Sequence, residues 1–161
     1  MPLYLLLHEG GHVLVAKWCG ARIVEFNLFE AYVIAEGGSF NKVSLAMFDA
    51  AGMLMPVSVF TLYLISYKED KKQAFYRIFS AFFTGMNLFS VGVWVVLPIK
   101  YIMGTANVND DVTKFIEVTK IHPIKISLAA SVALGIYSLI IWRKKVFQNG
   151  YEALRQKEDK R

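Results

Sequence analysis

Residues 5 to 15 read LLLHEGGHVLV, so that His8, Glu9 and His12 lie inside the first apolar segment of the chain. Ionisable side chains in a membrane-spanning helix cost roughly 2.5–3.5 kcal/mol each on insertion scales, and they persist where they pair, line a cavity or bind an ion. The histidines are four residues apart, which places both imidazoles on one face of a helix, one turn apart. These side chains therefore predict a polar site within an apolar helix.

The same three residues form the pattern H-E-x-x-H, in which two histidines bind a metal ion and the glutamate acts as a base. A zinc ion lowers the pKa of a bound water molecule to about 7, so that hydroxide becomes available at neutral pH. Glu9 need not bind the metal and can instead take a proton from that water and pass it to a leaving amine. The motif predicts His8 and His12 as zinc ligands and Glu9 as the catalytic base.

A catalytic zinc site usually has three protein ligands and one open position, so that a third ligand is expected elsewhere in the chain. Asp110 and Asp111, in the stretch NVNDDVTKF, are the favoured candidates, and the residues alone leave open which of them binds. Helix capping is the alternative role for either one, because Asp is common at helix starts. Asp49, in the second apolar block, and His122 are less favoured candidates.

Four apolar blocks dominate this chain of 161 residues, which is 55% hydrophobic and only 19% charged. Soluble proteins of this size are rarely so apolar, and blocks of this kind indicate membrane spans. The first block is just long enough for a thin bilayer, and the others can cross a hydrocarbon core of roughly 30 Å at 1.5 Å per residue. The blocks are residues 2–18, 43–66, 78–103 and 124–142. We therefore expect an α-helical integral membrane protein with about four transmembrane helices.

Two shorter elements are expected between these blocks. The stretch ARIVEFNLFEAYVIAEGGSF is rich in Val, Ile and Phe and partly alternates with Glu and Asn. It predicts a short β-hairpin after the first helix, which turns near residues 29–30 and closes at residues 37–38. Further along, Asn109 or Asp110 is placed to cap a short helix over residues 112–119.

The charges also favour a membrane setting. The net charge is +5, and most basic residues flank the apolar blocks, which favours a lipid bilayer over nucleic acid as the partner. With four spans, eleven Lys and Arg lie on the side of the C-terminal tail and seven on the other side, which favours a cytoplasmic tail. Residues 1–145 are expected to form the membrane-embedded domain, and residues 146–161 a charged, solvated helical tail. The single cysteine, Cys19, excludes an internal disulfide and a thiol-based zinc site.

On these features the sequence resembles the site-2 protease family of intramembrane zinc metalloproteases, in particular its short bacterial members. HEGGHVLVAKWCGARI is similar to the opening helix of the family, and EFNLFEAYVIAEGG resembles the short strands that follow it. AAGMLMPV is similar to the small-residue segment of the family's next helix, although Met53 stands where the family has proline. NVNDDVTKFIEVTKIHP resembles its aspartate segment. The resemblance covers roughly residues 3 to 125.

The resemblance implies that His8 and His12 bind zinc and that Glu9 is the base. It implies that Asp110 or Asp111 is the third zinc ligand, with Asp111 slightly favoured. It further implies a multi-pass zinc endopeptidase in the cell membrane of a prokaryote, which cleaves transmembrane or membrane-associated protein substrates with a metal-activated water. Such a substrate would have to unwind, and the hairpin is expected to hold it as an added strand.

Two other classes of protein remain open at this stage. One is a metal-binding membrane protein without peptidase activity, and the intact Glu9 argues against it because metal binding alone needs no base. The other is a structural or transport four-helix membrane protein without zinc, in which His8 pairs with Glu9 or Asp49. In the endopeptidase, the small residues Gly52, Gly85 and Gly92 are expected to let helices pack closely around the site.

Overall fold

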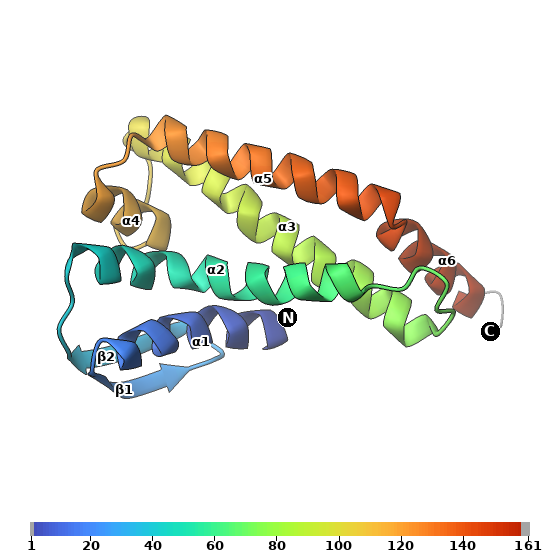
Figure 1. Cartoon of the computed structure of the whole chain (residues 1–161), viewed down its shortest axis with the longest axis horizontal. Coiled ribbons are helices and arrows are strands. Elements are labelled where there is room, and N and C mark those ends of the chain that lie inside the picture. The colour runs from blue at the N-terminus through green and yellow to red at the C-terminus, as the bar shows by residue number, and fades with distance from the viewer. Residues whose placement is uncertain (1, 159–161) are drawn as a thin grey trace.

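Six helices and one β-hairpin make up residues 2–158, the part of the chain that this computed structural model describes (Figure 1). In chain order the elements are α1 (Pro2–Trp18), β1 (Ala21–Asn27), β2 (Tyr32–Gly37), α2 (Lys42–Ser66), α3 (Ala74–Ile102), α4 (Asp111–Thr119), α5 (Pro123–Arg143) and α6 (Val146–Glu158). The expected helices and the expected hairpin are all present, with bounds close to those predicted.

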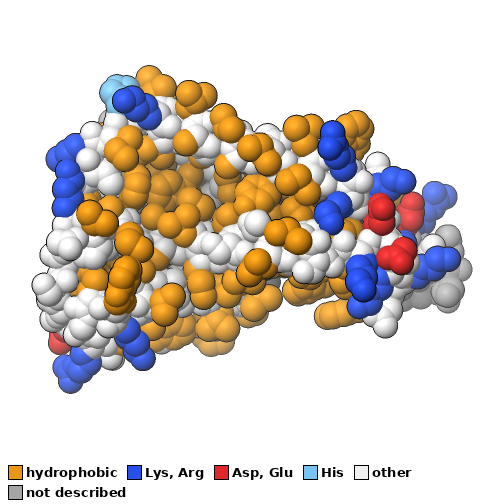
Figure 2. Space-filling view, in the orientation of Figure 1, with side chains coloured by type: hydrophobic (Ala, Val, Ile, Leu, Met, Phe, Trp, Pro, Cys, Tyr) orange, Lys and Arg blue, Asp and Glu red, His pale blue; other side chains and the backbone are white. Residues whose placement is uncertain are grey.

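Three helices, α2, α3 and α5, are long and apolar enough to cross a membrane, with 25, 29 and 21 residues. α1 is apolar but shorter, with 17 residues, and lies beside the first half of α2 (Figure 1). Of the four expected spans, the structure therefore has three of spanning length. The outer face of α5 carries large apolar side chains that are each more than half exposed, namely Ile124, Leu128, Val132 and Ile136. Figure 2 shows such apolar surface between two ends of the molecule that carry lysine and arginine.

α1 and α2 approach closely because each has a glycine that faces the other helix. A Cβ atom at Gly11 would lie 2.3 Å from the carbonyl oxygen of Ala51. A Cβ atom at Gly52 would lie 2.5 Å from both His12 Nε2 and His8 Cε1. The two imidazole rings therefore lie directly against the backbone of α2. Gly85 and Gly92 have open space around them, so the expectation of close packing is wrong for these two glycines.

Proline also shapes the middle of α2. Pro56 is buried inside this helix, one turn after Gly52. Because proline has no amide hydrogen, the carbonyl oxygen of Gly52 has no intrahelical donor. One backbone hydrogen bond of α2 is therefore missing beside the histidine rings.

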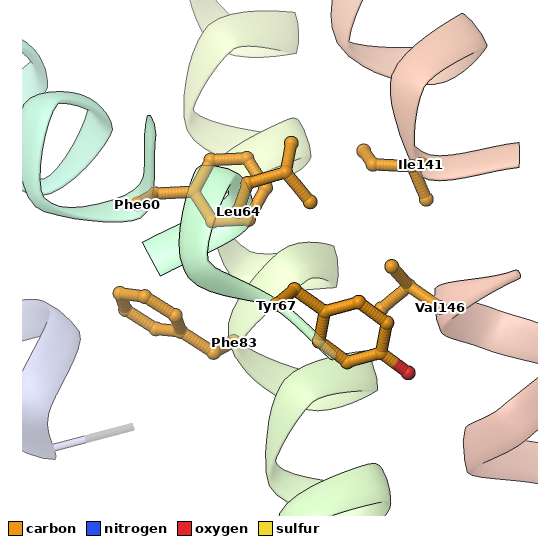
Figure 3. Packing of buried hydrophobic residues seen from close by; sticks show 6 residues of the cluster. All are labelled: Phe60, Leu64, Tyr67, Phe83, Ile141 and Val146. Carbon is orange, nitrogen blue, oxygen red and sulfur yellow. The ribbon is translucent and has the colours of Figure 1, made fainter. Parts of the chain in front are cut away.

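The core lies where α2, α3, α5 and α6 meet, and it consists of aromatic and branched side chains (Figure 3). Its buried members are Phe60, Leu64, Tyr67, Phe83, Ile141 and Val146. Residues 146–161 were expected to be helical and solvated, and α6 is indeed a helix, but one of its faces is buried against α3. Asn149 on this face donates a hydrogen bond of 2.9 Å to the Tyr67 hydroxyl, so its polar side chain is satisfied there.

A second cluster holds α4 against α2 and α3. Val112 and Ile116 of α4 are buried together with Ala50 and Trp94. Asp110 is the N-cap of this helix: its carboxylate accepts hydrogen bonds of 2.8 Å from the amide and 2.9 Å from the hydroxyl of Thr113. The prediction of a short capped helix is thus confirmed, and its first residue is Asp111.

The hairpin is confirmed as well. β1 and β2 are antiparallel, from the pair Ala21 and Gly37 to the pair Asn27 and Tyr32. The Asn27 side chain accepts hydrogen bonds of 3.1 Å from the amides of Phe29 and Glu30, which closes the turn where it was predicted. The hairpin and α4 lie at the same end of the molecule, around the C-terminal half of α1 (Figure 1).

Candidate metal centre

His8, His12 and Asp111 come together from α1 and the first residue of α4, and each offers one ligand atom within 4.8 Å of the others. Asp111 Oδ2 lies 3.4 Å from His8 Nε2 and 3.3 Å from His12 Nε2. In a tetrahedral zinc site with bonds of about 2.0–2.1 Å, neighbouring ligand atoms are roughly 3.3–3.4 Å apart. Both nitrogen–oxygen distances match this spacing, and two imidazole nitrogens with one carboxylate oxygen are a set of ligand atoms that suits zinc.

The His12 ring is oriented by the backbone of α2. Its Nδ1 atom lies 2.8 Å from the carbonyl oxygen of Phe48. Because a carbonyl oxygen only accepts, Nδ1 donates the hydrogen, and in the neutral ring the lone pair of Nε2 faces Asp111. His8 differs, because its buried Nδ1 has no hydrogen-bond partner among residues 2–158. One ring is thus held by a hydrogen bond and packing, and the other by packing against Gly52.

Asp111 lies outside the long helices, and its ionisation follows from its neighbours. Burial raises the pKa of the Asp111 carboxyl, but when the His12 and His8 rings are protonated, their hydrogen bonds and positive charge outweigh this and hold the pKa well below its usual range. A carboxylate must be ionised to bind a metal ion. Asp111 is therefore already in the form that a metal site requires.

Glu9 lies beside the ligand group without belonging to it. Its side chain is buried, and Oε1 is 3.9 Å from His8 Nε2. Glu9 and both histidines line the same cavity. A base placed in this way can reach a molecule bound in front of the histidines while leaving the ligand positions to other residues.

The other candidates have different positions. Asp110 caps α4 and lies outside the group of His8, His12 and Asp111. The two neighbouring aspartates, which the sequence could not tell apart as candidate ligands, thus have different positions. His122 caps α5, where its Nδ1 accepts a hydrogen bond of 3.3 Å from the amide of Ile124. Asp49 is buried in α2, and its Oδ2 atom has no hydrogen-bond partner in the described part of the chain.

The ligand group opens into a cavity of about 570 Å³ between α1, α2, α3, α4 and the end of the hairpin. Most of its lining is apolar, including Leu5, Met86, Phe89 and Val93. Its polar part includes Tyr4, whose hydroxyl donates a hydrogen bond of 2.7 Å to Ser90 and so links α1 to α3.

No match was found when the chain was compared with family models, with curated proteins and with solved structures.

The sequence did not single out Tyr4, Ser90 or Phe48. Tyr4 lies four residues before His8 and therefore on the same helical face, which is a signal that spacing alone could have provided. The Phe48 carbonyl offers no such signal, because a backbone group becomes a partner only once two helices have packed.

Proposed function

We propose that this protein is an integral membrane zinc endopeptidase of the site-2 protease type. The observation that carries the proposal is the convergence of His8, His12 and Asp111 beside Glu9. Three helices of spanning length support the membrane setting. When bound, zinc lowers the pKa of a water molecule to about 7 and polarises the carbonyl group to be cleaved.

The residues of the chain have separate roles in this proposal. His8, His12 and Asp111 hold the metal ion, and the Phe48 carbonyl keeps His12 in the tautomer that binds through Nε2. Glu9 takes a proton from the attacking water and later delivers it to the amine that leaves.

The cavity supports a protein substrate that lies in or on the membrane. Ala31, Tyr32 and Val33, from the end of the turn and the start of β2, line the cavity. β2 pairs only with β1 in residues 2–158, so its other edge is free. An extended peptide can add to such an edge through main-chain hydrogen bonds. A transmembrane substrate segment would unwind to do so, and the apolar lining would receive its side chains.

We place the protein, as a multi-pass protein, in the cell membrane of a prokaryote. This placement follows from the resemblance to the short bacterial members of the family. The three apolar helices and the charged ends of the molecule are consistent with it.

The test is zinc content and cleavage in the detergent-purified full chain. We expect about one zinc ion per chain, lost in His8→Ala. We also expect Glu9→Gln to keep zinc but to cleave membrane-reconstituted reporter helices at least about 100-fold more slowly, because general base catalysis contributes 10²–10⁴-fold.

Absence of zinc from the wild-type chain, even after incubation with zinc, would contradict the metal centre. Unchanged cleavage in Glu9→Gln would contradict the role of Glu9. Stoichiometric zinc without any cleavage by the wild type would favour a metal-binding membrane protein that is not a peptidase.

A further inference from the structure

We propose that the junction of α5 and α6 binds one anionic phospholipid. A groove of about 240 Å³ lies there, between α3 and the two helices of the junction. It is at the opposite end of the molecule from α4 and the hairpin, and hence from the candidate metal centre (Figure 1). The inference goes beyond the proposed function, and it requires only that the chain lies in a membrane.

The groove suits an acyl chain better than water. Its apolar lining comes from Leu88, Ile141, Trp142 and Phe147. The volume is several times the roughly 30 Å³ that one water molecule takes up in the liquid, but each ordered water needs two to four polar partners. Most of the exposed surface of this groove is apolar, and a hydrocarbon chain against it needs no polar partner.

The position of the groove along α5 matches the level of lipid headgroups. α5 is a strongly apolar spanning helix and ends at Arg143. Trp142, just before this end, is 70% exposed. Tryptophan is enriched where hydrocarbon meets water. A lipid in the groove would therefore have its chain beside α5 and its headgroup beside the α5–α6 junction.

The mouth of the groove carries positive charge. Lys145 lines the groove, is exposed, and its ammonium group has no acceptor within residues 2–158. Its neighbour Lys144 is engaged instead, since its Nζ lies 3.4 Å from the carbonyl oxygens of Ile65 and Tyr67. Arg143 adds a further exposed cation, and no acidic residue lines the groove. This charge complements a phosphodiester.

The start of α6 adds hydrogen-bond donors at the same place. The first intrahelical bond runs from the Asn149 amide to the Lys145 carbonyl at 2.8 Å. The preceding amides, of Val146, Phe147 and Gln148, have no acceptor in the described chain. Phe147 and Gln148 line the groove together with Lys145. Free amides at a helix N-terminus bind phosphate, so the ammonium group and these amides can share one phosphate.

The test is native mass spectrometry of the delipidated full chain, titrated with phosphatidylglycerol or with phosphatidylcholine of the same acyl chains. Lys145 has a left-handed backbone with φ of 53°, which asparagine tolerates, so Lys145→Asn removes the charge without straining the junction. Lys120→Asn is the matched control, because Lys120 is also exposed and left-handed, with φ of 60°, but lies at the end of α4. Ser138→Trp fills the groove itself.

We expect the wild type to bind phosphatidylglycerol more tightly than phosphatidylcholine. Lys145→Asn should weaken binding of phosphatidylglycerol about fivefold, the usual effect of one lysine at an anionic lipid surface, and Lys120→Asn should leave it unchanged. Ser138→Trp should weaken binding of both lipids. Circular dichroism checks that each variant keeps the helix content of the wild type, and Lys145→Gln replaces Lys145→Asn if that variant does not.

Equal affinity for the two lipids, or equal effects of the Lys145 and Lys120 variants, would overturn the assignment of the headgroup. Unchanged binding in Ser138→Trp would overturn the assignment of the acyl chain. Zinc content is measured on the same samples, so that a failure here is distinguished from a failure of the proposed metal centre.

Discussion

At Gly52 a missing side chain determines where the two histidine rings can lie. Any Cβ atom there would meet His12 Nε2 and His8 Cε1 at 2.5 Å, so Gly52→Ala must displace the rings or separate the helices. We predict that this variant binds zinc 10–100-fold more weakly, which is the usual effect of disturbing the groups that orient metal ligands. Competition with a chromophoric chelator measures the affinity.

The matched control for this prediction is Gly85→Ala on α3, where an added Cβ has no neighbour within 4 Å. Zinc affinity in this variant should equal that of the wild type. Wild-type affinity in Gly52→Ala would show that packing on α2 does not position the rings.

The adjacent residues Asp110 and Asp111 should respond differently to the same substitution. Asp111→Ala removes a proposed ligand and should lose zinc. Asp110→Ala removes only the N-cap of α4, so it should keep one zinc ion per chain while losing about 0.5–2 kcal/mol of stability. Elemental analysis and thermal unfolding measure the two effects. A zinc-free Asp110→Ala protein beside a zinc-bound Asp111→Ala protein would reverse the assignment.

The site residues also show which side-chain positions could be predicted from the sequence and which could not. His8, Glu9 and His12 were predictable because their relation depends only on the repeat of a single helix. The choice between Asp110 and Asp111 depends on which of them begins α4, and either can cap a helix. In the structure Asp110 accepts a hydrogen bond from Thr113 while Asp111 faces the histidines, and this arrangement supports Asp111 as the proposed ligand.

At the scale of helices, α1 and α2 provide a test of close packing. Gly11→Ala would place Cβ 2.3 Å from the Ala51 carbonyl oxygen, and overpacking of this kind usually destabilises by about 1–3 kcal/mol. Gly10→Ala, at the next position, has open space and should leave the stability equal or up to about 1 kcal/mol higher. Unfolding of the two purified variants in mixed detergent compares them. Equal stability of the pair would mean that α1 and α2 pack less closely than described.

The elements themselves were largely predictable, since apolar length and turn residues reveal helices and hairpin without knowledge of the fold. The buried face of α6 could not be predicted. Its composition suggests a solvated tail, and the burial of Asn149 becomes understandable only through its hydrogen bond to Tyr67, which is distant in sequence. Long-range polar pairs of this kind have no local signature.

For the molecule as a whole, zinc binding should depend on pH in a specific way. Free imidazole takes up a proton near pH 6.5, and protonated imidazole cannot bind a metal ion. Asp111 stays ionised over the same range because His12 and His8 lower its pKa despite its burial. A carboxyl with a lowered pKa loses its contribution only as the pH falls through that low value. Once both imidazoles are protonated, zinc affinity should therefore fall up to about 100-fold per pH unit, which corresponds to two protons.

Zinc affinity measured between pH 7.5 and 5.5 in the full chain checks this dependence. A limiting slope near three protons would show that the carboxylate also titrates, and a flat profile would exclude imidazole ligation.

The backbone hydrogen bond that Pro56 removes from α2 makes the candidate site sensitive to the thickness of the lipid bilayer. With 25 residues, α2 is about 38 Å long and exceeds a hydrocarbon core of roughly 30 Å, so it has to tilt or flex. Flexing is easiest where a backbone hydrogen bond is missing, and in α2 this is at Gly52, against both histidine rings. We expect zinc affinity in nanodiscs to change with acyl-chain length, and the same affinity in all lengths would contradict this. Bilayer thickness would then change the bend of α2 and, with it, the positions of the two histidine rings.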